Sequence, residues 1–291
     1  MGEKGMEYRR LYNGVRMPIL GYGVYQIDSP QTERCVLDAI DCGYRLIDTA
    51  QAYGNEEGVG SAVAKSGVPR DELFITSKVW VTNFGEGNTM RSIDESLRRL
   101  GTDYLDLMLL HQAYGDYYGA YRDLEKAYEQ GKVRAIGVSN FDFNRILDLS
   151  TFARIKPMVN QVETHVYWQQ RQNHQVMEDL DIAHEAWSPF AEGANGFFRD
   201  PILTAISQGH GKTVAQVALR YLMDLGVIVI PKSVHKERME QNFDVFDFEL
   251  TDEDRDRIAR MDADKSVVLD HRDPKTVAWL MGLFANEPKQ A

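Results

Sequence analysis

The sequence predicts an α/β protein, a (β/α)8 (TIM) barrel, and three observations support this fold class. Eight short apolar runs alternate with segments of helical periodicity along the 291 residues, as in a barrel of parallel strands with helices outside. The runs are almost continuously apolar, as expected of strands that are buried on both faces. Seven of the eight runs end in a polar or hydrogen-bonding side chain, and a (β/α)8 barrel carries its functional groups at these strand ends.

The predicted strands lie in order along the chain, at residues 19–23, 45–49, 73–79, 104–111, 133–139, 158–163, 182–187 and 227–232. Segments with helical periodicity follow them, with examples at residues 30–43, 89–101, 120–131 and 213–226. Each of these four segments ends at a glycine, which readily adopts the left-handed conformation found just past a helix end. An open doubly wound sheet is the main alternative. Its first turn usually carries a G-x-G-x-x-G motif, and GYG at residues 21–23 lacks the third glycine.

Short extensions are predicted at both ends of a single domain that covers residues 1–291. Residues 7–18 are expected to form a β-hairpin around the two-residue turn Asn13-Gly14, which could plug the N-terminal end of the barrel. Helices are expected after the last strand, and a C-terminal extension covers about residues 250–291. These helices are predicted at residues 236–242, 251–261 and 274–283.

Composition and charge exclude several classes of function. The formal net charge of −11 repels the phosphates of nucleic acids and anionic lipids, so neither is expected as a partner. No run of about 18 apolar residues and no signal-peptide core occurs, which points to a cytoplasmic protein. Cys35 and Cys42 lie on one predicted helix, too far apart to form a disulfide. The seven histidines show no zinc-binding spacing, so no metal is expected.

The polar groups at the predicted strand ends are the candidate functional residues. They are Asp48, Lys78, His111, Ser139 with Asn140, Gln161, Trp187 with Ser188, and Lys232 with Ser233. Any one of them could be a structural residue whose hydrogen bonds are satisfied within the core. A ring of such groups at one face is harder to explain by core packing, and it predicts an active site there.

The first of these groups predict acid–base chemistry. A buried lysine or aspartate is costly unless paired, so Asp48 and Lys78 are expected to form an ion pair across adjacent strands. Lys78 is expected to lower the pKa of Tyr53, which follows Asp48 by five residues, so that this tyrosine acts as a general acid. His111 is expected to hold the oxygen of the substrate by a hydrogen bond from its ring.

None of these side chains supplies a hydride, so a cofactor is expected. Residues 230–242 gather Lys232, His235, Lys236 and Arg238 at the end of the last strand and the start of a helix, an arrangement that suits a phosphate. Trp187 offers a flat ring for an aromatic ligand. The alternatives are a solvated basic helix face and a core tryptophan.

At this point the sequence resembles the aldo-keto reductase family over about residues 7–283. The resemblance is carried by RLIDTAQAYGNEEGVG (45–60), FITSKVW (74–80), LDLMLLH (105–111), IGVSNF (136–141), VNQVETH (159–165) and IPKSVHKERMEQN (230–242). Trp187 followed by Ser-Pro is similar to the bacterial branch that includes 2,5-diketo-gluconate reductases and protozoal prostaglandin F synthases. The resemblance implies a (β/α)8 barrel, commonly monomeric, that reduces small carbonyl compounds with NADPH and without a metal.

The resemblance also implies roles for individual residues. Asp48, Tyr53, Lys78 and His111 match the catalytic tetrad, with Tyr53 as proton donor. Ser139, Asn140 and Gln161 match the groups that bind the nicotinamide carboxamide, and Trp187 matches the ring that stacks on the nicotinamide. Lys232, Ser233 and Arg238 match the binders of the adenosine 2′-phosphate, which favours NADPH over NADH. The remaining predicted contacts of the cofactor are Gly23, Val24, Ser188 and Asn242.

The substrate pocket departs from the family pattern. Tyr25 and Trp80 match pocket-wall positions, but the family's usual His-Trp-Pro is His111-Gln112-Ala113 here. Because Gln112 removes an aromatic wall and the segment after it is short, the pocket is expected to be open. Glu192 lies where a loop over the cofactor pyrophosphate is expected, and it either weakens cofactor binding or points to solvent. The aromatic site suits small aldehydes, diketones and sugar-derived carbonyls.

Two other functions remain as alternatives. An NADPH-binding barrel that regulates a partner without significant turnover would keep the cofactor site. A purely structural barrel would have neither role. The intact tetrad argues against the regulatory barrel, and a structural barrel would leave the fluorescence of NADPH unchanged on mixing.

Overall fold

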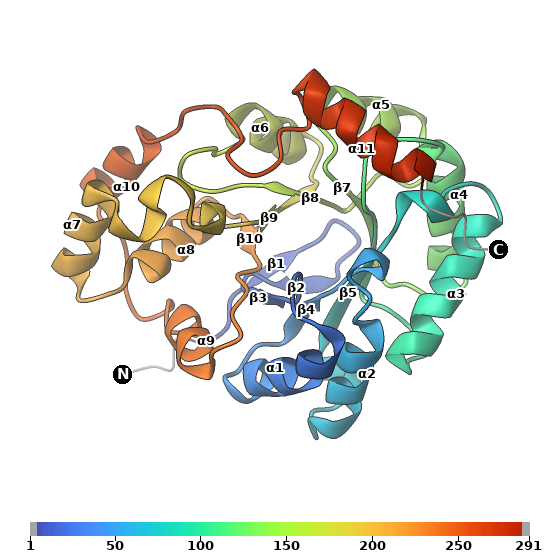
Figure 1. Cartoon of the computed structure of the whole chain (residues 1–291), viewed down its shortest axis with the longest axis horizontal. Helices are drawn as coiled ribbons and strands as arrows, with labels where there is room; N and C mark the ends of the chain where they lie inside the picture. Colours follow the sequence, from blue (N-terminus) through green and yellow to red (C-terminus); the bar gives the residue numbers. More distant parts are fainter. Residues whose placement is uncertain (1–4, 287–291) are drawn as a thin grey trace.

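The computed structural model describes residues 5–286 and has the predicted fold, a barrel of eight parallel strands with helices outside (Figure 1). Each barrel strand lies within one of the eight predicted runs. In order around the sheet, the strands are β3 (Gly21–Gly23), β4 (Leu46–Asp48), β5 (Phe74–Val79), β6 (Leu107–Leu110), β7 (Ile136–Ser139), β8 (Val159–Glu163), β9 (Ala183–Trp187) and β10 (Ile228–Val229).

The sheet closes between its first and last strands. Leu20 and Val229 form a parallel bridge, and the backbone N–H of Val229 donates to the carbonyl of Ile19 at 2.9 Å. Gly23 is needed at this seam, because a Cβ there would lie 3.1 Å from the carbonyl oxygen of Ile230. Closure excludes the open doubly wound sheet and brings all strand ends to one face.

The helices lie between the strands and pack outside the barrel. They are α1 (Ser29–Asp41), α2 (Glu56–Lys65), α3 (Asn88–Leu100), α4 (Tyr117–Glu129), α5 (Phe143–Phe152), α6 (Arg171–Asp179), α7 (Pro201–His210) and α8 (Val214–Asp224). Short 3-10 segments also occur, namely η1 (Gln51–Tyr53), η2 (Arg70–Glu72), η3 (Val81–Asn83) and η4 (Ala191–Arg199). Local chemistry sets the ends of the α-helices. Thr213 and Gln216 form a capping box at the start of α8, and Gly101, with φ +62°, ends α3.

The N-terminal hairpin pairs β1 (Tyr8–Arg10) with β2 (Arg16–Pro18) and packs under the barrel. Its turn differs from the expected two-residue type. The backbone N–H of Leu11 donates to the carbonyl of Val15 at 2.8 Å, which leaves a loop of three residues with Gly14 in the left-handed region. The Tyr12 hydroxyl donates to the carbonyl of Lys156, just before β8, so the hairpin covers the N-terminal end of the barrel as predicted.

Within the described part of the chain, three helices follow the barrel, as expected. They are α9 (Lys236–Phe243), α10 (Asp252–Ala259) and α11 (Pro274–Asn286). Thr251 and Asp254 form a capping box at the start of α10. Cys35 is buried and Cys42 half-buried, and both are free thiols. None of the helices within residues 5–286 has the length and apolar character needed to cross a membrane.

Candidate active site

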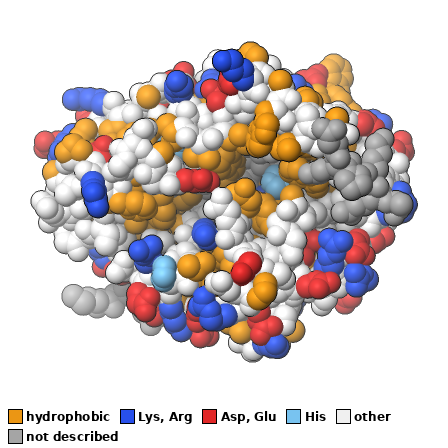
Figure 2. Space-filling view, viewed as in Figure 1, with side chains coloured by type: hydrophobic (Ala, Val, Ile, Leu, Met, Phe, Trp, Pro, Cys, Tyr) orange, Lys and Arg blue, Asp and Glu red, His pale blue; other side chains and the backbone are white. Residues whose placement is uncertain are grey.

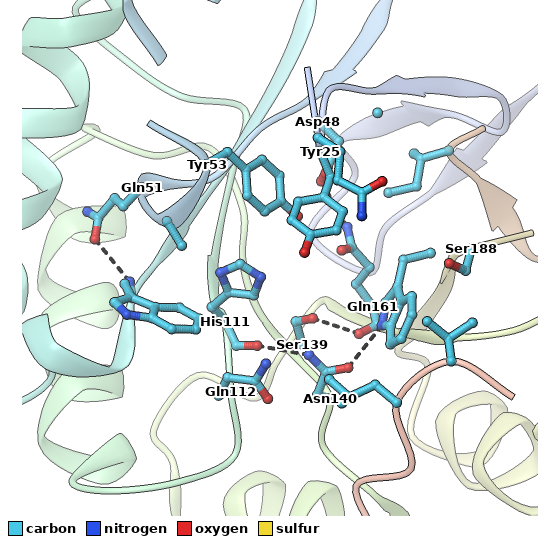
Figure 3. Close-up of a pocket in the computed structure, with 18 of the residues that line it drawn as sticks. Tyr25, Asp48, Gln51, Tyr53, His111, Gln112, Ser139, Asn140, Gln161 and Ser188 are labelled. Carbon is cyan, nitrogen blue, oxygen red and sulfur yellow. Dashed lines mark hydrogen bonds between the residues drawn. The ribbon is translucent and has the colours of Figure 1, made fainter. Parts of the chain in front are cut away.

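The predicted strand-end residues gather around one cavity of about 960 Å³ at the C-terminal face of the barrel (Figure 3). Figure 2 shows this face hollowed, with hydrophobic side chains along the hollow. The predicted residues that line the cavity are Gly23, Tyr25, Asp48, Tyr53, Trp80, His111, Gln112, Ser139, Asn140, Gln161, Trp187, Ser188, Glu192 and Lys232. Lys78 lies beneath the cavity. Val24, Ser233, Arg238 and Asn242 do not line it.

Lys78 binds Asp48 and Tyr53 in the arrangement predicted from the sequence. Its Nζ donates to Asp48 Oδ1 at 2.5 Å, to the carbonyl of Thr49 at 3.0 Å and to the Tyr53 hydroxyl oxygen at 3.2 Å. These bonds use all three ammonium hydrogens. Because the Tyr53 oxygen accepts from Lys78, its own hydrogen remains available to a group in the cavity.

The expected lowering of the Tyr53 pKa is wrong. Burial raises the pKa of Tyr53 to about 12; the Lys78 ammonium lowers it, and the Asp48 carboxylate raises it again. Burial lowers the pKa of Lys78, but Asp48 and Tyr53 raise it above its ordinary value overall. Sequence reasoning counted the lysine and omitted desolvation and the second charge of the ion pair. Tyr53 therefore carries its proton throughout the neutral range.

His111 directly follows β6 and faces Tyr53, with ring centroids 5.6 Å apart. Burial, together with the charge of Lys78, holds the pKa of His111 well below its ordinary value, so the imidazole is neutral. Its Nδ1 is buried and has no hydrogen-bond partner within residues 5–286. A neutral imidazole next to a protonated phenol gives two hydrogen-bond donors for one oxygen atom.

Polar groups on β7, β8 and β9 form a shelf beside the tetrad. The Trp187 indole N–H donates to Asn140 Oδ1 at 2.9 Å, and Asn140 Nδ2 donates to the carbonyl of His111 at 3.0 Å. The Ser139 hydroxyl donates to the backbone carbonyl of Gln161 at 2.8 Å. These bonds fix the indole next to two amide side chains, which is the arrangement needed to seat a flat ring that carries an amide.

Residues of the basic segment lie along the end of the barrel, where α9 begins. Lys232 and Arg238 are exposed, and neither forms a salt bridge within the described chain. Lys236 instead approaches Asp41 at 3.4 Å. Ser233 is mostly buried and its hydroxyl accepts from the backbone N–H of His235. Two unpaired cations next to a helix N-terminus form an electropositive site in an otherwise acidic protein.

Val24 does not fit its predicted role. Its side chain is fully buried, its N–H donates to the carbonyl of Asp48 at 3.1 Å, and its carbonyl accepts from Asn55 Nδ2 at 3.0 Å. Both backbone groups are therefore engaged within the protein. Val24 therefore has a structural role, whereas its neighbours Gly23 and Tyr25 line the cavity.

The C-terminal segment, residues 266–284, adds a wall on one side of the cavity that the sequence did not predict. Phe284 of α11 packs on Trp80 with ring centroids 5.3 Å apart. Gln112 Oε1 is 2.9 Å from His271 Nε2, so the residue that replaces the family's tryptophan contacts this segment. Sequence reasoning missed its cavity-lining residues Val268, Leu269, Trp279, Leu280 and Leu283. The apolar character of residues 277–284 after the barrel was the available signal.

Two buried acids were also missed. Glu163, at the end of β8, accepts hydrogen bonds from His165, Ser266 and the backbone N–H groups of residues 267–269. Burial raises the pKa of Glu163, but these donors lower it below its ordinary value overall. Glu185, in β9, is fully buried and accepts from Gln161 Nε2 at 2.9 Å. Acids within the apolar runs 158–163 and 182–187 were the signal.

Comparison with known proteins agrees with this site. The Aldo/keto reductase family model matches residues 19–263. The chain belongs to the aldo/keto reductase family. Glyoxal reductase of Bacillus subtilis (strain 168) is 46% identical over 260 residues, which cover 89% of this chain and 94% of that protein. Methylglyoxal reductase DkgA of Yersinia pestis is 44% identical over 259 residues, which cover 88% of this chain and 93% of that protein.

A solved structure supports the cofactor. The Bombyx mori aldo-keto reductase in complex with NADP superposes with a TM-score of 0.87 at 35% identity, and the match covers 93% of this chain and 97% of that one. This aldo/keto reductase is therefore an NADP-dependent oxidoreductase that acts on small carbonyl compounds. Within residues 5–286 there is no cluster of three or more His, Cys, Asp or Glu side chains that could hold a metal ion.

Proposed function

We propose that this aldo/keto reductase converts small aldehydes and vicinal dicarbonyl compounds to alcohols, with Tyr53 as proton donor. The observation that carries the proposal is the geometry of Lys78, Tyr53 and His111. Lys78 holds the oxygen of Tyr53 from below, and the hydroxyl hydrogen and the neutral His111 ring remain for one oxygen in the cavity.

The reaction follows from these positions. The carbonyl oxygen accepts hydrogen bonds from the Tyr53 hydroxyl and a ring N–H of His111. When bound, NADPH would supply a hydride to the carbonyl carbon. The π electrons of the carbonyl would then move to its oxygen, and the Tyr53 proton would transfer to that oxygen to give the alcohol. An alkoxide is far more basic than a phenolate, so Tyr53 donates even with a pKa of about 12. Lys78 stabilises the phenolate that remains, and Asp48 balances the charge of Lys78.

The residues present fit this cofactor. Ser139, Asn140 and Gln161 would bind the carboxamide, and the face of Trp187, fixed by Asn140, would carry the nicotinamide ring. Lys232, Ser233 and Arg238 would bind the 2′-phosphate, with Asn242 near the adenine. Gly23 and Ser188 line the cavity between these ends. Glu192 is exposed and lies 3.4 Å from the Ser188 hydroxyl, so solvent screens its charge.

The substrate class rests on the cavity wall and on the relatives. Tyr25 and Trp80 give the cavity aromatic sides, and the C-terminal cover adds Leu280 and Leu283. Gln112 adds one polar group to this wall. Two relatives at 46% and 44% identity are named for glyoxal and methylglyoxal, which are small vicinal dicarbonyls. A steady-state panel of glyoxal, methylglyoxal, propanal and keto-sugars, followed by NADPH consumption, tests this class.

Tyr53→Phe tests the mechanism. Loss of the proton donor is expected to lower kcat by about 10²–10⁴-fold, because general acid catalysis contributes on this order. NADPH binding, followed by fluorescence, is expected to persist. Near-normal turnover in Tyr53→Phe would contradict the role of Tyr53. An NADPH-binding regulatory barrel would instead show cofactor binding and no consumption in the unmodified protein with any member of the panel.

The cofactor preference is tested with two neighbouring cations. Arg238→Ala is expected to weaken NADPH binding roughly tenfold or more and NADH binding little, since charge-assisted bonds to a phosphate are lost. Lys236→Ala is the matched control, because Lys236 already approaches Asp41. Equal weakening of both cofactors in Arg238→Ala would show that the basic segment does not recognise the 2′-phosphate.

We also propose that the chain is a single-domain monomer in the cytoplasm. The hairpin, α9 and α10 pack on the same core, and both cysteines are free thiols. Size-exclusion chromatography with light scattering, limited proteolysis and cell fractionation test these three points.

A further inference from the structure

Glu185 is a buried acid that the reaction proposed above does not use. It lies in the middle of β9, opposite Gln161 of β8 in the strand register, and its side chain is 0% exposed. A carboxyl group in this position costs stability, and an aliphatic residue of similar size would pack there without that cost. Because Glu185 forms a hydrogen bond with Gln161, which lines the cavity, a role other than packing is expected for this acid.

The bonds of Glu185 define such a role through Gln161. Gln161 Nε2 donates to Glu185 Oε2 at 2.9 Å and to Asp48 Oδ2, across the barrel, also at 2.9 Å. An amide NH2 has two hydrogens, and both are used by these two acceptors. A flipped amide would place its oxygen against two carboxyl groups, so the NH2 end is fixed on chemical grounds.

The opposite end of the amide is consequently free. Gln161 lines the cavity, and its Oε1 has no hydrogen-bond partner within residues 5–286. It is an acceptor only, so the group that it takes from a ligand must be a donor. The carboxamide NH2 of nicotinamide is such a donor, and the neighbouring shelf of Ser139, Asn140 and Trp187 would hold that ring.

We propose that Glu185 is a positioning residue: together with Asp48 it fixes the amide of Gln161, so that Gln161 Oε1 receives the NH2 of the nicotinamide carboxamide. Asp48 alone would hold one hydrogen and leave the amide free to turn about its last torsion. Glu185 supplies the second point. This inference rests on the proposed binding of NADPH at the shelf.

The charge state of Glu185 is compatible with this role. Burial raises the pKa of Glu185 to about 8, and the Asp48 carboxylate contributes to the increase, whereas Gln161 and Lys78 lower the pKa. At neutral pH the group is an uncharged acid whose carbonyl oxygen accepts from Gln161. The remaining oxygen, Oε1, is buried without a partner, which disfavours an ionised carboxylate.

The experiment compares two cofactors that differ at one group. In the acetylpyridine analogue of NADPH, a methyl group replaces the NH2 of the carboxamide, so it has nothing to donate to Gln161. The dissociation constants of both cofactors are measured by fluorescence quenching for the unmodified protein, Glu185→Leu, Glu185→Gln and Thr76→Val. Thr76→Val removes a buried hydroxyl of β5 that has no hydrogen-bond partner within residues 5–286, so it breaks no bond to Gln161 and serves as the control.

The unmodified protein is expected to prefer NADPH over the analogue. Glu185→Leu is expected to reduce this preference roughly fivefold, the equivalent of one neutral hydrogen bond, while thermal unfolding shows a folded protein. Glu185→Gln keeps a carbonyl acceptor and is expected to restore the preference, and Thr76→Val to leave it unchanged. A merely structural effect would weaken both cofactors equally in Glu185→Leu.

The inference is overturned if Glu185→Leu keeps the full preference, or if the unmodified protein binds both cofactors equally. In the second case Gln161 does not receive the carboxamide NH2. Failure of the proposed function gives different results: the unmodified protein would either not bind NADPH at all, or bind NADPH with the expected preference over the analogue and consume none with any member of the carbonyl panel.

Discussion

The floor of the cavity and the C-terminal segment that covers it (residues 266–284, the cover) are held in place by charged groups of opposite sign. On the floor, one cation, Lys78, donates hydrogen bonds to three acceptors. One of these acceptors, Asp48, also accepts from Gln161, which in turn donates to Glu185. In the cover, one anion, Glu163, receives hydrogen bonds from five donors, of which Ser266 and the backbone N–H groups of residues 267–269 belong to the cover itself. The floor is a network that spans the barrel, whereas the cover combines the bonds at Glu163 with separate contacts such as Gln112 to His271 and Trp80 to Phe284.

This difference separates chemistry from selectivity. Asp48 and Lys78 lie in β4 and β5, His111 directly follows β6, and Tyr53 lies in η1 just after β4, so the sheet fixes the positions of the groups that transfer the proton. The groups that contact the rest of the substrate come from the cover, which can change without disturbing the strands. Conditions that break the floor should therefore abolish turnover, and conditions that loosen the cover should change which substrates are used.

The largest expected effect comes from breaking the floor at its only lysine. Lys78→Met leaves the buried Asp48 carboxylate without its cation, so the free energy of unfolding is expected to fall by about 3–5 kcal/mol. The rate of reduction is expected to fall by at least about 100-fold, because the phenolate of Tyr53 loses its charge partner. Urea denaturation and steady-state kinetics measure the two quantities.

A double variant separates these two effects. Asp48→Asn with Lys78→Met removes both charges, so much of the lost stability is expected to return while the rate stays low. If the double variant regained normal reduction, the ion pair would have only a structural role.

The sequence predicts the floor of the cavity better than it predicts the cover. Strand ends are set by local patterns of apolar residues, and in a closed barrel they share one face. Asp48, Lys78, His111 and Gln161 could therefore be placed together before any coordinates. The pKa of Tyr53 could not, because its sign depends on how much water reaches the hydroxyl, and this is a property of the packed cavity.

The cover was not predicted because its contacts are distant in sequence. Glu163 contacts Ser266, which lies 103 residues later, and Phe284 reaches Trp80. No local pattern fixes where a helix after the barrel returns to it. The length of the hairpin turn was predicted wrongly for a different reason. Asn13-Gly14 indicates a turn, but these two residues also occur in a three-residue loop with Gly14 in the left-handed region.

The next effect is expected from the cover. Glu163→Gln places an NH2 group among donors, so at least one of them loses its acceptor, and the free energy of unfolding is expected to fall by about 2 kcal/mol. KM for methylglyoxal is expected to rise several-fold because Val268 and Leu269 lose their support, while kcat changes little.

Glu125→Gln provides the matched control. Glu125 is also a buried acid that accepts from a backbone N–H, that of Ile155 at 2.8 Å, but it does not line the cavity. A comparable loss of stability with an unchanged KM is expected. A rise in KM in both variants would show that general destabilisation, and not the cover, determines KM.

The smallest expected effect returns to the floor and concerns pH. The pKa of Glu185 is raised to about 8 in the folded protein, above the ordinary value that it has in the unfolded chain. Between these two pKa values the folded state holds a proton that the unfolded state has released, so this contribution to stability is complete in acid and is lost as pH rises to about 8.

Glu185→Gln has no proton to release. From pH 6 to pH 7, the unmodified protein is expected to lose up to about 1.4 kcal/mol relative to this variant, as the linkage of one proton per pH unit requires. Chemical denaturation of both proteins across this range measures the difference, in which the other titrating groups cancel. Parallel curves would mean that Glu185 is already ionised at neutral pH and that the floor carries two negative charges for one lysine.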